Sequence, residues 1–383
     1  MRKTITIGDL GTIITGKTPP TTNKNYYGDY AVFIKPTDIS EQSKYTYETE
    51  EMYSKLAAEK YESSLIPKGA ICVPCIGTIG TKMTMAPCDC YTNQSINSIV
   101  CNENYDNEYV YYLIKNFLPG LKAYNLGTAS GREYVSKSNF EKIELVAEQD
   151  KTIQKRIGVI LSRYDSLIEN YQKQIQLLEE AAQRLYKEWF VDLHFPGHEN
   201  TKIADGVPEG WEKKKVGDMI SKIQRTKQVT TNNYQASGKI PVIDQSRNYI
   251  AGYTDDAECL VKVTVPYIVF GDHTRILKYI PFSFAKGADG TQLIMSNDLE
   301  RMPQTLFYNS LIEIDLSNYS YARHFKYLKE EFVLLPSEYI ARKYDSIVSR
   351  YYQSIQKSRE QIRLLSEARD RLLPKLMSGE IDI

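Results

Sequence analysis

The chain contains one long helical stretch twice, as LSRYDSLIENYQKQIQLLEEAAQRLYKEWF at residues 161–190 and as VSRYYQSIQKSREQIRLLSEARDRLLPKLM at residues 348–377. The copies lie 187 residues apart and align without a gap, and 12 of the 30 paired positions are identical. An internal repeat indicates that one structural unit is used twice. We therefore expect the chain to be organised around two related helices.

Both copies carry apolar residues at alternating spacings of four and three, which is coiled-coil periodicity. The pattern in the second copy is broken at Ser358 and Arg369. We predict that the helix from about Arg156 to Trp189 packs on its repeat; the alternative, an amphipathic helix in a globular core, is disfavoured because about 35 residues exceed the usual helix length. The predicted seam residues are Leu161, Tyr164, Ile168, Ile175, Leu178, Leu185, Val348, Tyr351, Ile355, Ile362, Leu365 and Leu372.

Length and composition are those of an ordinary soluble protein. The chain has 383 residues, of which 42% are hydrophobic and 25% charged, so we expect two to three domains. Neither an export signal nor an apolar run of 18 residues is present, and we therefore expect a cytoplasmic protein without a membrane span. The formal net charge is zero, with 48 basic and 48 acidic residues. This balance argues against a simple cationic protein that coats nucleic acid.

Four of the six cysteines have spacings that could indicate a zinc site. Cys72 and Cys75 form a CxxC pair, and Cys88 and Cys90 follow closely. Zinc ligands usually come as two pairs of similar spacing, whereas the second pair here is CxC and the first lies in a strand-like run, residues 70–76. We therefore expect buried free thiols and no metal.

Residues 1–150 read as a globular domain of short strands and loops. The predicted strands are Thr4–Ile7, Ala31–Ile34, Ala70–Ile76 and Ile96–Val100, with a helix at Glu108–Phe117.

GTIITGKT, at Gly11–Thr18, matches the phosphate-loop spacing Gly-x4-Gly-Lys-Thr. A phosphate loop must lead straight into a helix, but Pro19 and Pro20 disfavour helical angles in the residues before them. Nucleotide binding is therefore a minor alternative.

The first domain has a counterpart later in the chain. Val216–Met219 repeats the pattern of Ile7–Leu10, and Phe332–Leu335 repeats that of Ile143–Val146, while the residues between them do not align. A shared frame with different interiors suits a protein that recognises two different targets with one geometry. A Pro- and Gly-rich linker precedes the second domain. The predicted segments are residues 1–150 (domain 1), 151–198 (helix 1 and linker), 199–336 (domain 2) and 337–383 (helix 2 and tail).

This arrangement of domain, helix, domain, helix resembles the specificity subunit of type I restriction-modification systems over essentially the whole chain. Five local stretches support the resemblance: Gly16–Pro19, Ile34–Ile39, Gly77–Gly80, Pro208–Trp211 and Lys375–Ile381. The resemblance implies an α+β fold with two mixed α/β target recognition domains, separated by two long helices that form an antiparallel coiled coil with pseudo-twofold symmetry. Each domain would read one half of a bipartite, asymmetric DNA target, and the helices would set the spacer and dock the modification subunits.

The resemblance also implies a non-catalytic subunit without a cofactor of its own. S-adenosylmethionine, ATP and Mg would act in partner subunits of the DNA-methylating complex. The implied partners are double-stranded DNA, two modification subunits and, through the complex, restriction subunits, with no membrane. The alternatives are a coiled-coil scaffold with two protein-binding domains and, third, a phosphate-loop nucleotide hydrolase.

Asp272–Arg275 is the only dense polar cluster beside a predicted strand, Tyr267–Phe270. A catalytic role would require a nucleophile or metal partner that the sequence does not indicate, so DNA contact or a structural role is favoured. DNA readers use Arg, Lys, Asn and Gln on base edges and phosphates. The candidate contacts are Lys17, Lys35, Lys82, Asn93, Gln94, Asn97 and Arg132 in domain 1, and Arg225, Lys227, Gln245, Arg247, His273, Arg275, Lys286, Gln292 and Arg323 in domain 2.

Overall fold

The computed structural model describes residues 2–127, 131–224, 226–319 and 323–383. The chain divides into two compact units: Met1–Gln172 with Glu360–Ile383, and Lys173–Arg359. Each unit combines one globular domain with about half of each long helix, so the units cut across the linear segments expected from the sequence. The two cuts fall after residues 172 and 359, which are equivalent positions of the internal repeat.

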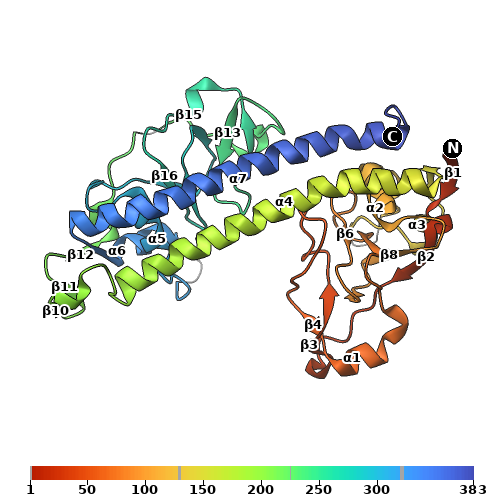
Figure 1. Ribbon diagram of the computed structural model, residues 1–383, viewed down its shortest axis with the longest axis horizontal. Coiled ribbons are helices and arrows are strands. Elements are labelled where there is room, and N and C mark those ends of the chain that lie inside the picture. The colour runs from red at the N-terminus through yellow and green to blue at the C-terminus, as the bar shows by residue number, and fades with distance from the viewer. Residues whose placement is uncertain (1, 128–130, 225, 320–322) are drawn as a thin grey trace. The chain divides into compact units, whose positions relative to one another are not determined.

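The two long helices are α4, Lys151–Tyr186, and α7, Glu338–Ser378 (Figure 1). A π-helical turn at Lys187–Val191 ends α4. In the first unit Asp165 of α4 pairs with Arg369 of α7, and in the second unit Glu179 pairs with Arg359. The α7 partner moves toward the N-terminus as α4 proceeds, so the helices run antiparallel. Both long helices that the apolar spacing predicts are therefore present.

The seam residues divide into two groups by burial. Leu161, Ile168, Val348 and Ile355 are at most 2% exposed, and the other eight are partly buried. The partly buried group consists of Tyr164, Ile175, Leu178, Leu185, Tyr351, Ile362, Leu365 and Leu372.

The break in the apolar pattern at Arg369 is a buried ion pair. Arg369 and Asp165 are 7% and 4% exposed, and the guanidinium donates to one carboxylate oxygen of Asp165. The hydroxyl of Tyr112, on helix α2, donates to the other oxygen. The equivalent of Arg369 in the first copy is Ala182. The ion pair therefore has no counterpart at the equivalent position of the first copy. Through Tyr112 it joins both long helices to the first domain.

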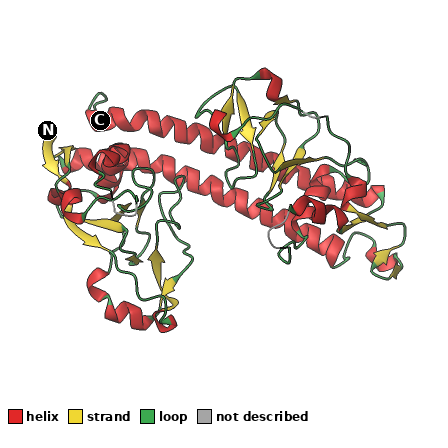
Figure 2. Ribbon diagram, turned by 180° about the vertical axis from the view of Figure 1, so that it is seen from behind, coloured by secondary structure: helices red, strands yellow, loops and turns green. Residues whose placement is uncertain are grey.

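The first domain contains two small sheets and a strand pair. Its sheets are ordered β2-β8-β5-β6 and β4-β3-β7, and β1 pairs with β9 in antiparallel register. Figure 2 distinguishes helices, strands and loops by colour. The strands are β1 Arg2–Thr6, β2 Gly11–Thr15, β3 Tyr27–Ile34, β4 Met52–Tyr53, β5 Ile71–Pro74, β6 Thr84–Met85, β7 Tyr91–Thr92, β8 Ile96–Cys101 and β9 Glu144–Glu148; the helices are α1 Lys55–Lys60, α2 Asn107–Phe117 and α3 Lys137–Glu141.

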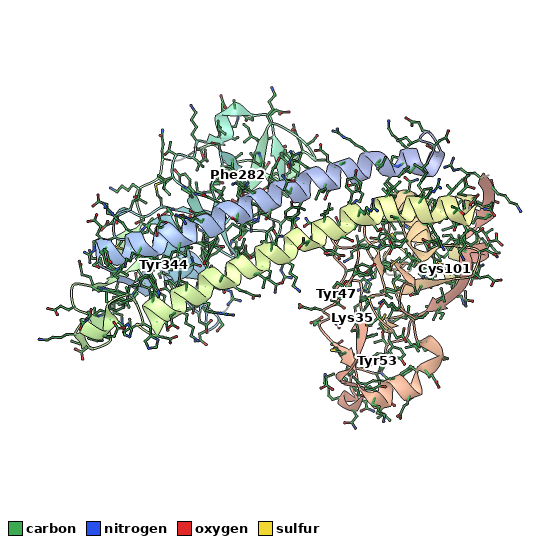
Figure 3. The ribbon with its side chains drawn as sticks, viewed as in Figure 1. Lys35, Tyr47, Tyr53, Cys101, Phe282 and Tyr344 are labelled. Atoms are coloured by element: carbon green, nitrogen blue, oxygen red, sulfur yellow. The ribbon has the colours of Figure 1, made fainter. Side chains whose placement is uncertain are left out.

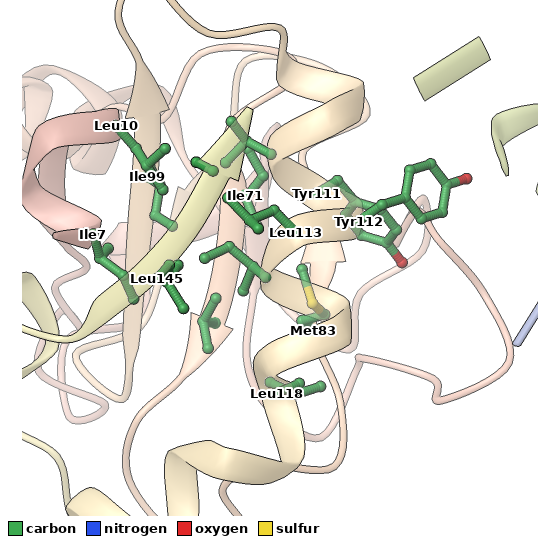
Figure 4. Close-up of a cluster of buried hydrophobic side chains, with 14 of the residues drawn as sticks. Ile7, Leu10, Ile71, Met83, Ile99, Tyr111, Tyr112, Leu113, Leu118 and Leu145 are labelled. Carbon is green, nitrogen blue, oxygen red and sulfur yellow. The ribbon is translucent and has the colours of Figure 1, made fainter. Parts of the chain in front are cut away.

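The core of the first domain continues onto the long helices. Ile71 of β5, Ile99 of β8 and Leu113 of α2 belong to one buried cluster (Figure 4). The same cluster includes Leu161 of α4 and Leu376 of α7. Residues of both long helices in this unit thus belong to the same buried cluster as residues of β5, β8 and α2.

The second domain has the same kinds of element. Its sheets are ordered β14-β13-β18-β15 and β17-β16-β19, with strand pairs β12-β20 and β10-β11. The strands are β10 Ile203–Ala204, β11 Val207–Pro208, β12 Glu212–Lys215, β13 Ile240–Ile243, β14 Gly252–Thr254, β15 Leu260–Val261, β16 Tyr267–Gly271, β17 Leu277–Ile280, β18 Phe284–Lys286, β19 Thr291–Ile294 and β20 Phe332–Leu335; the helices are α5 Gln304–Ile312 and α6 His324–Glu330.

The duplicated frame is visible in individual hydrogen bonds. The side-chain amide of Asn102 donates to the carbonyl of Asp9 at 3.0 Å, and that of Asn297 donates to Asp218 at 2.7 Å. The backbone N–H of Ile7 donates to Ile143 at 2.9 Å, and its counterpart Val216 donates to Glu331 at 2.8 Å. The shared pattern at the start of each domain therefore corresponds to the same local geometry. At the end of each domain the expected alignment is shifted by one residue, because Phe332 takes the pairing position of Glu144 and not that of Ile143.

The remaining predictions about elements are confirmed with shifts at their ends. The expected strand Thr4–Ile7 is β1, but it ends at Thr6 because a 3-10 turn capped by Thr6 begins at Ile7. Gly11–Thr15 of the GTIITGKT stretch is the strand β2, and a loop follows it where a phosphate loop would require a helix. In the part of the chain that the structure describes, no helix is long and apolar enough to cross a membrane.

The buried ion pair gives a test of the helix pairing. Asp165→Ala removes the buried carboxylate that pairs with Arg369 and leaves its guanidinium only the exposed carboxylate of Asp370. We therefore expect the free energy of unfolding to fall by about 3 kcal/mol. The triple variant Asp165→Leu, Arg369→Leu, Tyr112→Phe removes all three polar groups together, so its stability should stay near that of the parent. Urea unfolding followed by circular dichroism measures both. A single variant as stable as the parent would contradict this assignment.

Candidate nucleic-acid interface

In the first domain, the loop after β2 and the turn before β8 form one exposed polar edge. Lys17 donates its backbone N–H to the carbonyl of Thr92 at 2.9 Å, and the Thr18 hydroxyl donates to the side chain of Gln94. A Cβ at Gly16 would lie 2.1 Å from the carbonyl oxygen of Thr92, so only glycine fits there. Lys17 and Gln94 are both exposed. The structure thus brings together two predicted DNA contacts from distant parts of the sequence.

Aromatic packing supports this edge from inside. The ring of Tyr53 stacks on Tyr91 with centroids 4.6 Å apart and lies 4.7 Å from Phe33, and its hydroxyl donates to the carbonyl of Lys17 at 2.5 Å. Burial raises the pKa of the Tyr53 hydroxyl well above its ordinary value, so it remains a donor at neutral pH. Sequence reasoning missed Tyr53, since nothing in the pattern around it links it to Lys17.

Lys35 is engaged by two carboxylates. Its amino group lies 2.8 Å from Glu50 and 3.1 Å from Glu51, and its side chain is 18% exposed (Figure 3). Its charge is therefore balanced, and it closes the loop of residues 35–51.

Asn93 and Asn97 both serve local structure. The prediction of Asn97 as a DNA contact is wrong: it is 3% exposed, and its side-chain oxygen accepts a hydrogen bond from the Thr15 hydroxyl at 2.7 Å. Asn93 is half-buried, and its side-chain oxygen accepts the backbone N–H of Ser95 at 3.0 Å. That bond shapes the turn that presents Gln94.

Lys82 and Arg132 flank a second pair of loops in the first domain. The backbone N–H of Gly77 donates to the carbonyl of Glu133 at 2.9 Å, and that of Ile79 donates to the Glu133 carboxylate at 3.2 Å. Arg132 is exposed and Lys82 half-buried.

In the second domain, Gln245 connects three loops. Its side-chain nitrogen donates to the carbonyl of Asp289 at 2.9 Å, and its side-chain oxygen accepts the backbone N–H of His273 at 3.1 Å. Its own carbonyl accepts the Thr274 hydroxyl at 2.7 Å. Gly290 has a φ of +75°, and a Cβ there would lie 2.7 Å from the side chain of Gln245. The loops after β13, β16 and β18 therefore meet at one point.

Asp272 is a structural residue of this cluster. It is 4% exposed, and its carboxylate accepts the backbone N–H of Phe325 at 2.8 Å, which ties it to the first turn of α6. The ring nitrogens of His324 each lie 2.9 Å from a carbonyl oxygen, of Asp272 and Tyr319. The carboxylate of Asp272 is thus engaged, which disfavours the catalytic alternative for this cluster.

His273, Arg275 and Arg323 are exposed around the same cluster. Arg275 has a φ of 63°, in the left-handed region, and its guanidinium donates to the carbonyl of Leu316 at 3.1 Å. Non-glycine residues with positive φ are uncommon and often lie at functional sites. Together with Gln245 and exposed Arg247, these residues form the polar edge of the second domain.

The other candidates of this domain have different surroundings. Lys227 pairs with Asp256 at 2.7 Å and Glu258 at 3.0 Å. Lys286 and Gln292 are half-buried, on β18 and β19. Arg225 lies outside the described residues.

The cysteines do not form a metal centre among the residues described, where no three His, Cys, Asp or Glu side chains gather. Cys72, Cys75 and Cys90 are buried free thiols, but the expectation of burial is wrong for Cys88, which is exposed. Burial raises the pKa of Cys72 to about 11 and that of Cys75 to about 12. Thiols with such raised pKa values are chemically inert at neutral pH.

Lys278 is a buried support that sequence reasoning missed. It is 4% exposed, and its amino group donates to the backbone carbonyls of Asp244 at 2.8 Å and Asn248. Burial lowers the pKa of this amine from 10.5 to about 8. The available signal was a lone lysine within the apolar strand β17. Lys278 holds both ends of the loop that carries Gln245 and Arg247.

The lowered pKa of Lys278 predicts a pH-dependent stability. Between about pH 8 and 10.5 the unfolded chain holds a proton at Lys278 that the folded chain has released, so stability rises with pH. As pH rises across this range, the free energy of unfolding of the parent should increase relative to that of Lys278→Met by on the order of 2 kcal/mol, since one pKa unit corresponds to about 1.4 kcal/mol. Urea unfolding of both proteins at pH 7 and pH 10 measures the difference. An identical pH dependence in both would refute it.

Comparison with known proteins finds similar chains in one family. Residues 2–180 match the family model described as the type I restriction modification DNA specificity domain. The chain is 26% identical to the type I restriction enzyme MjaIX specificity subunit of Methanocaldococcus jannaschii, over 98% of this chain and 93% of that protein. It is 36% identical to the HindI specificity subunit of Haemophilus influenzae over 164 residues, which cover 41% of this chain and 35% of that protein.

The fold is similar to a solved structure as well. The crystal structure of a type I restriction-modification S subunit from M. genitalium aligns with a TM-score of 0.59 and 18% identity, over 98% of this chain and 96% of that chain. At this identity the likeness shows a shared fold. Residues 2–180 thus match a type I restriction modification DNA specificity domain, and the chain is similar to the MjaIX specificity subunit over nearly its whole length.

Proposed function

We propose that the chain is the sequence-specific DNA recognition subunit of a type I restriction-modification complex, and that each domain reads one half of a bipartite, asymmetric target. The observation that carries the proposal is the duplicated frame with two different polar edges. Lys17 and Gln94 lie on the first edge, and Gln245, His273 and Arg275 form part of the second. Such groups read base edges and phosphates. Two edges of different composition on one frame suit two different half-sites.

The helices carry the second part of the proposal. Both α4 and α7 run without interruption from one unit into the other. We infer that they set the spacer between the half-sites and dock two modification subunits, with restriction subunits joining through the complex.

Catalysis belongs, in this proposal, to the partner subunits, which would use S-adenosylmethionine, ATP and Mg. Support comes from the two clusters that could have carried chemistry. The carboxylate of Asp272 is engaged at the start of α6, and the GTIITGKT stretch is a strand followed by a loop. The chain then contributes binding and orientation of the target.

Replacement of one recognition domain tests the modular assignment. A complex whose residues 205–335 come from a different specificity subunit should methylate a motif that is changed in one half only, because the first domain is untouched. Methylome sequencing of the host measures the motif. Replacement of the first domain is the matched control and should change the other half. Changes in both halves after a single replacement would disprove the modular assignment.

DNA binding should depend on the partners and on salt. With a net charge of zero the isolated chain has little attraction to phosphates, so we expect weak binding that the modification subunits strengthen. Mobility-shift titrations at several salt concentrations, with and without these subunits, should show an affinity that falls as salt rises. Tight, salt-insensitive binding by the isolated chain would contradict this expectation. Failure of the full complex to shift specific DNA would favour the protein scaffold instead.

A further inference from the structure

We propose that Arg359 of α7 is a positioning residue that determines specificity in the second domain. It seats the loop of residues 244–250 on the helix and thereby sets where Gln245 and Arg247 are presented. The inference rests on the proposed function and adds to it a residue that touches no DNA itself.

Arg359 makes two directional contacts. Its guanidinium carbon lies 3.7 Å from the centroid of the Tyr249 ring, and its Nη2 donates to the carboxylate of Glu179 on α4 at 2.9 Å. A planar guanidinium can stack flat on an aromatic face while N–H groups at its edge pair with a carboxylate, and the ammonium of lysine has no such plane. Burial raises the pKa of the Glu179 carboxyl, and the charge of Arg359 opposes that rise. Arg359 thus connects both long helices to one aromatic ring of the loop.

Tyr249 is fixed on its other side by the domain. Its hydroxyl donates to the carbonyl of Tyr279 on β17 at 2.7 Å. Its ring packs edge-on against that of Phe282, with 6.0 Å between the ring centroids. The neighbouring residue of β17, Lys278, holds the loop at Asp244 and Asn248. The loop is therefore held from the sheet by β17 and from the helices by Arg359.

A polar cavity lies beneath the loop. It has a volume of about 250 Å³ and is lined by Arg247, Tyr249 and Lys278 of the domain, and by Glu179, Tyr352 and Arg359 of the helices. Close packing does not fill this space. The height of the loop above the helices consequently depends on contacts that bridge the cavity, of which the stack of Arg359 on Tyr249 is one.

A shift of this loop would reach the whole polar edge. Gln245 is the second residue of the connection from β13 to β14, and it bonds to His273 and Asp289 in two other loops. Because these bonds are directional, movement of the loop after β13 changes the placement of all three loops. Loss of the Arg359 contact should therefore reduce discrimination among bases and leave the domain folded.

The internal repeat supplies a matched control. The equivalent of Arg359 in the first copy is Gln172, whose side-chain nitrogen donates to the carbonyl of Gln42 at 3.4 Å. Both positions hold a loop of their own recognition domain. The Gln172 contact is neutral, long and exposed, whereas that of Arg359 is charged, stacked and partly buried. We therefore expect position 359 to matter for its half-site and position 172 to matter little.

The experiment measures methylation by the intact complex on a DNA library in which each half-site carries single-base changes. Arg359→Ala should reduce discrimination at the half-site read by the second domain about tenfold, which is the order of the effect of one mismatched base pair. Discrimination at the other half-site should stay unchanged. Arg359→Lys keeps the charge pair but not the planar stack, so discrimination at this half-site should fall about threefold. Gln172→Ala should match the parent at both half-sites.

Tyr249→Leu removes the stack from the loop side and leaves the pair of Arg359 and Glu179 intact, so it should relax the same half-site even if Arg359→Ala does not fold. Thermal unfolding identifies any variant that fails to fold. Parent-like discrimination in both Arg359→Ala and Tyr249→Leu would overturn the proposal, as would an equal loss at both half-sites. A parent complex without a bipartite motif would instead refute the proposed function.

Discussion

The pairing of α4 with α7 depends on a buried charge, the guanidinium of Arg369, which requires a carboxylate partner. An apolar seam of repeating spacing tolerates a slip of one heptad, because one leucine replaces another. Arg369 does not tolerate it, since a slip would bury its guanidinium away from the Asp165 carboxylate. The Tyr112 hydroxyl on the same carboxylate extends the constraint to α2 and so to the first domain. We infer that this three-residue contact fixes the antiparallel register on which the placement of the domain against its helices rests.

The duplication explains how one chain can present two different surfaces. Bonds such as those of Asn102 and Asn297 repeat the frame, while the loops that the frames carry are held by unrelated contacts. Packing of Tyr53 against Tyr91 and Phe33 supports the first edge, whereas a buried lysine, Lys278, supports the second. The frame fixes where loops begin and end, and the loops are free to differ. The frame can therefore stay the same while the loops of the two domains differ.

The sequence was sufficient for the helices and the repeat because their signals are periodic and local. Burial and pairing of single polar side chains depend on distant residues, and there the predictions were weaker. Asn97 was expected at the surface, yet it faces Thr15 on the neighbouring strand β2, 82 residues away in the chain. Lys35 was expected to be available to DNA, yet Glu50 and Glu51 surround its amino group. The structural role of Lys278 was not predicted, because a lysine in a strand normally points to solvent. Such contacts arise from tertiary structure, which no local pattern encodes.

The central claim is that one duplicated frame reads two different half-sites of a split DNA target. Methylome sequencing of a host that carries the intact system, compared with the same host lacking this chain, tests it most directly. The account predicts a methylated motif with two unlike specific halves separated by bases of no fixed identity, and loss of that motif without the chain. A continuous motif, two identical halves, or a motif that persists without the chain would contradict it.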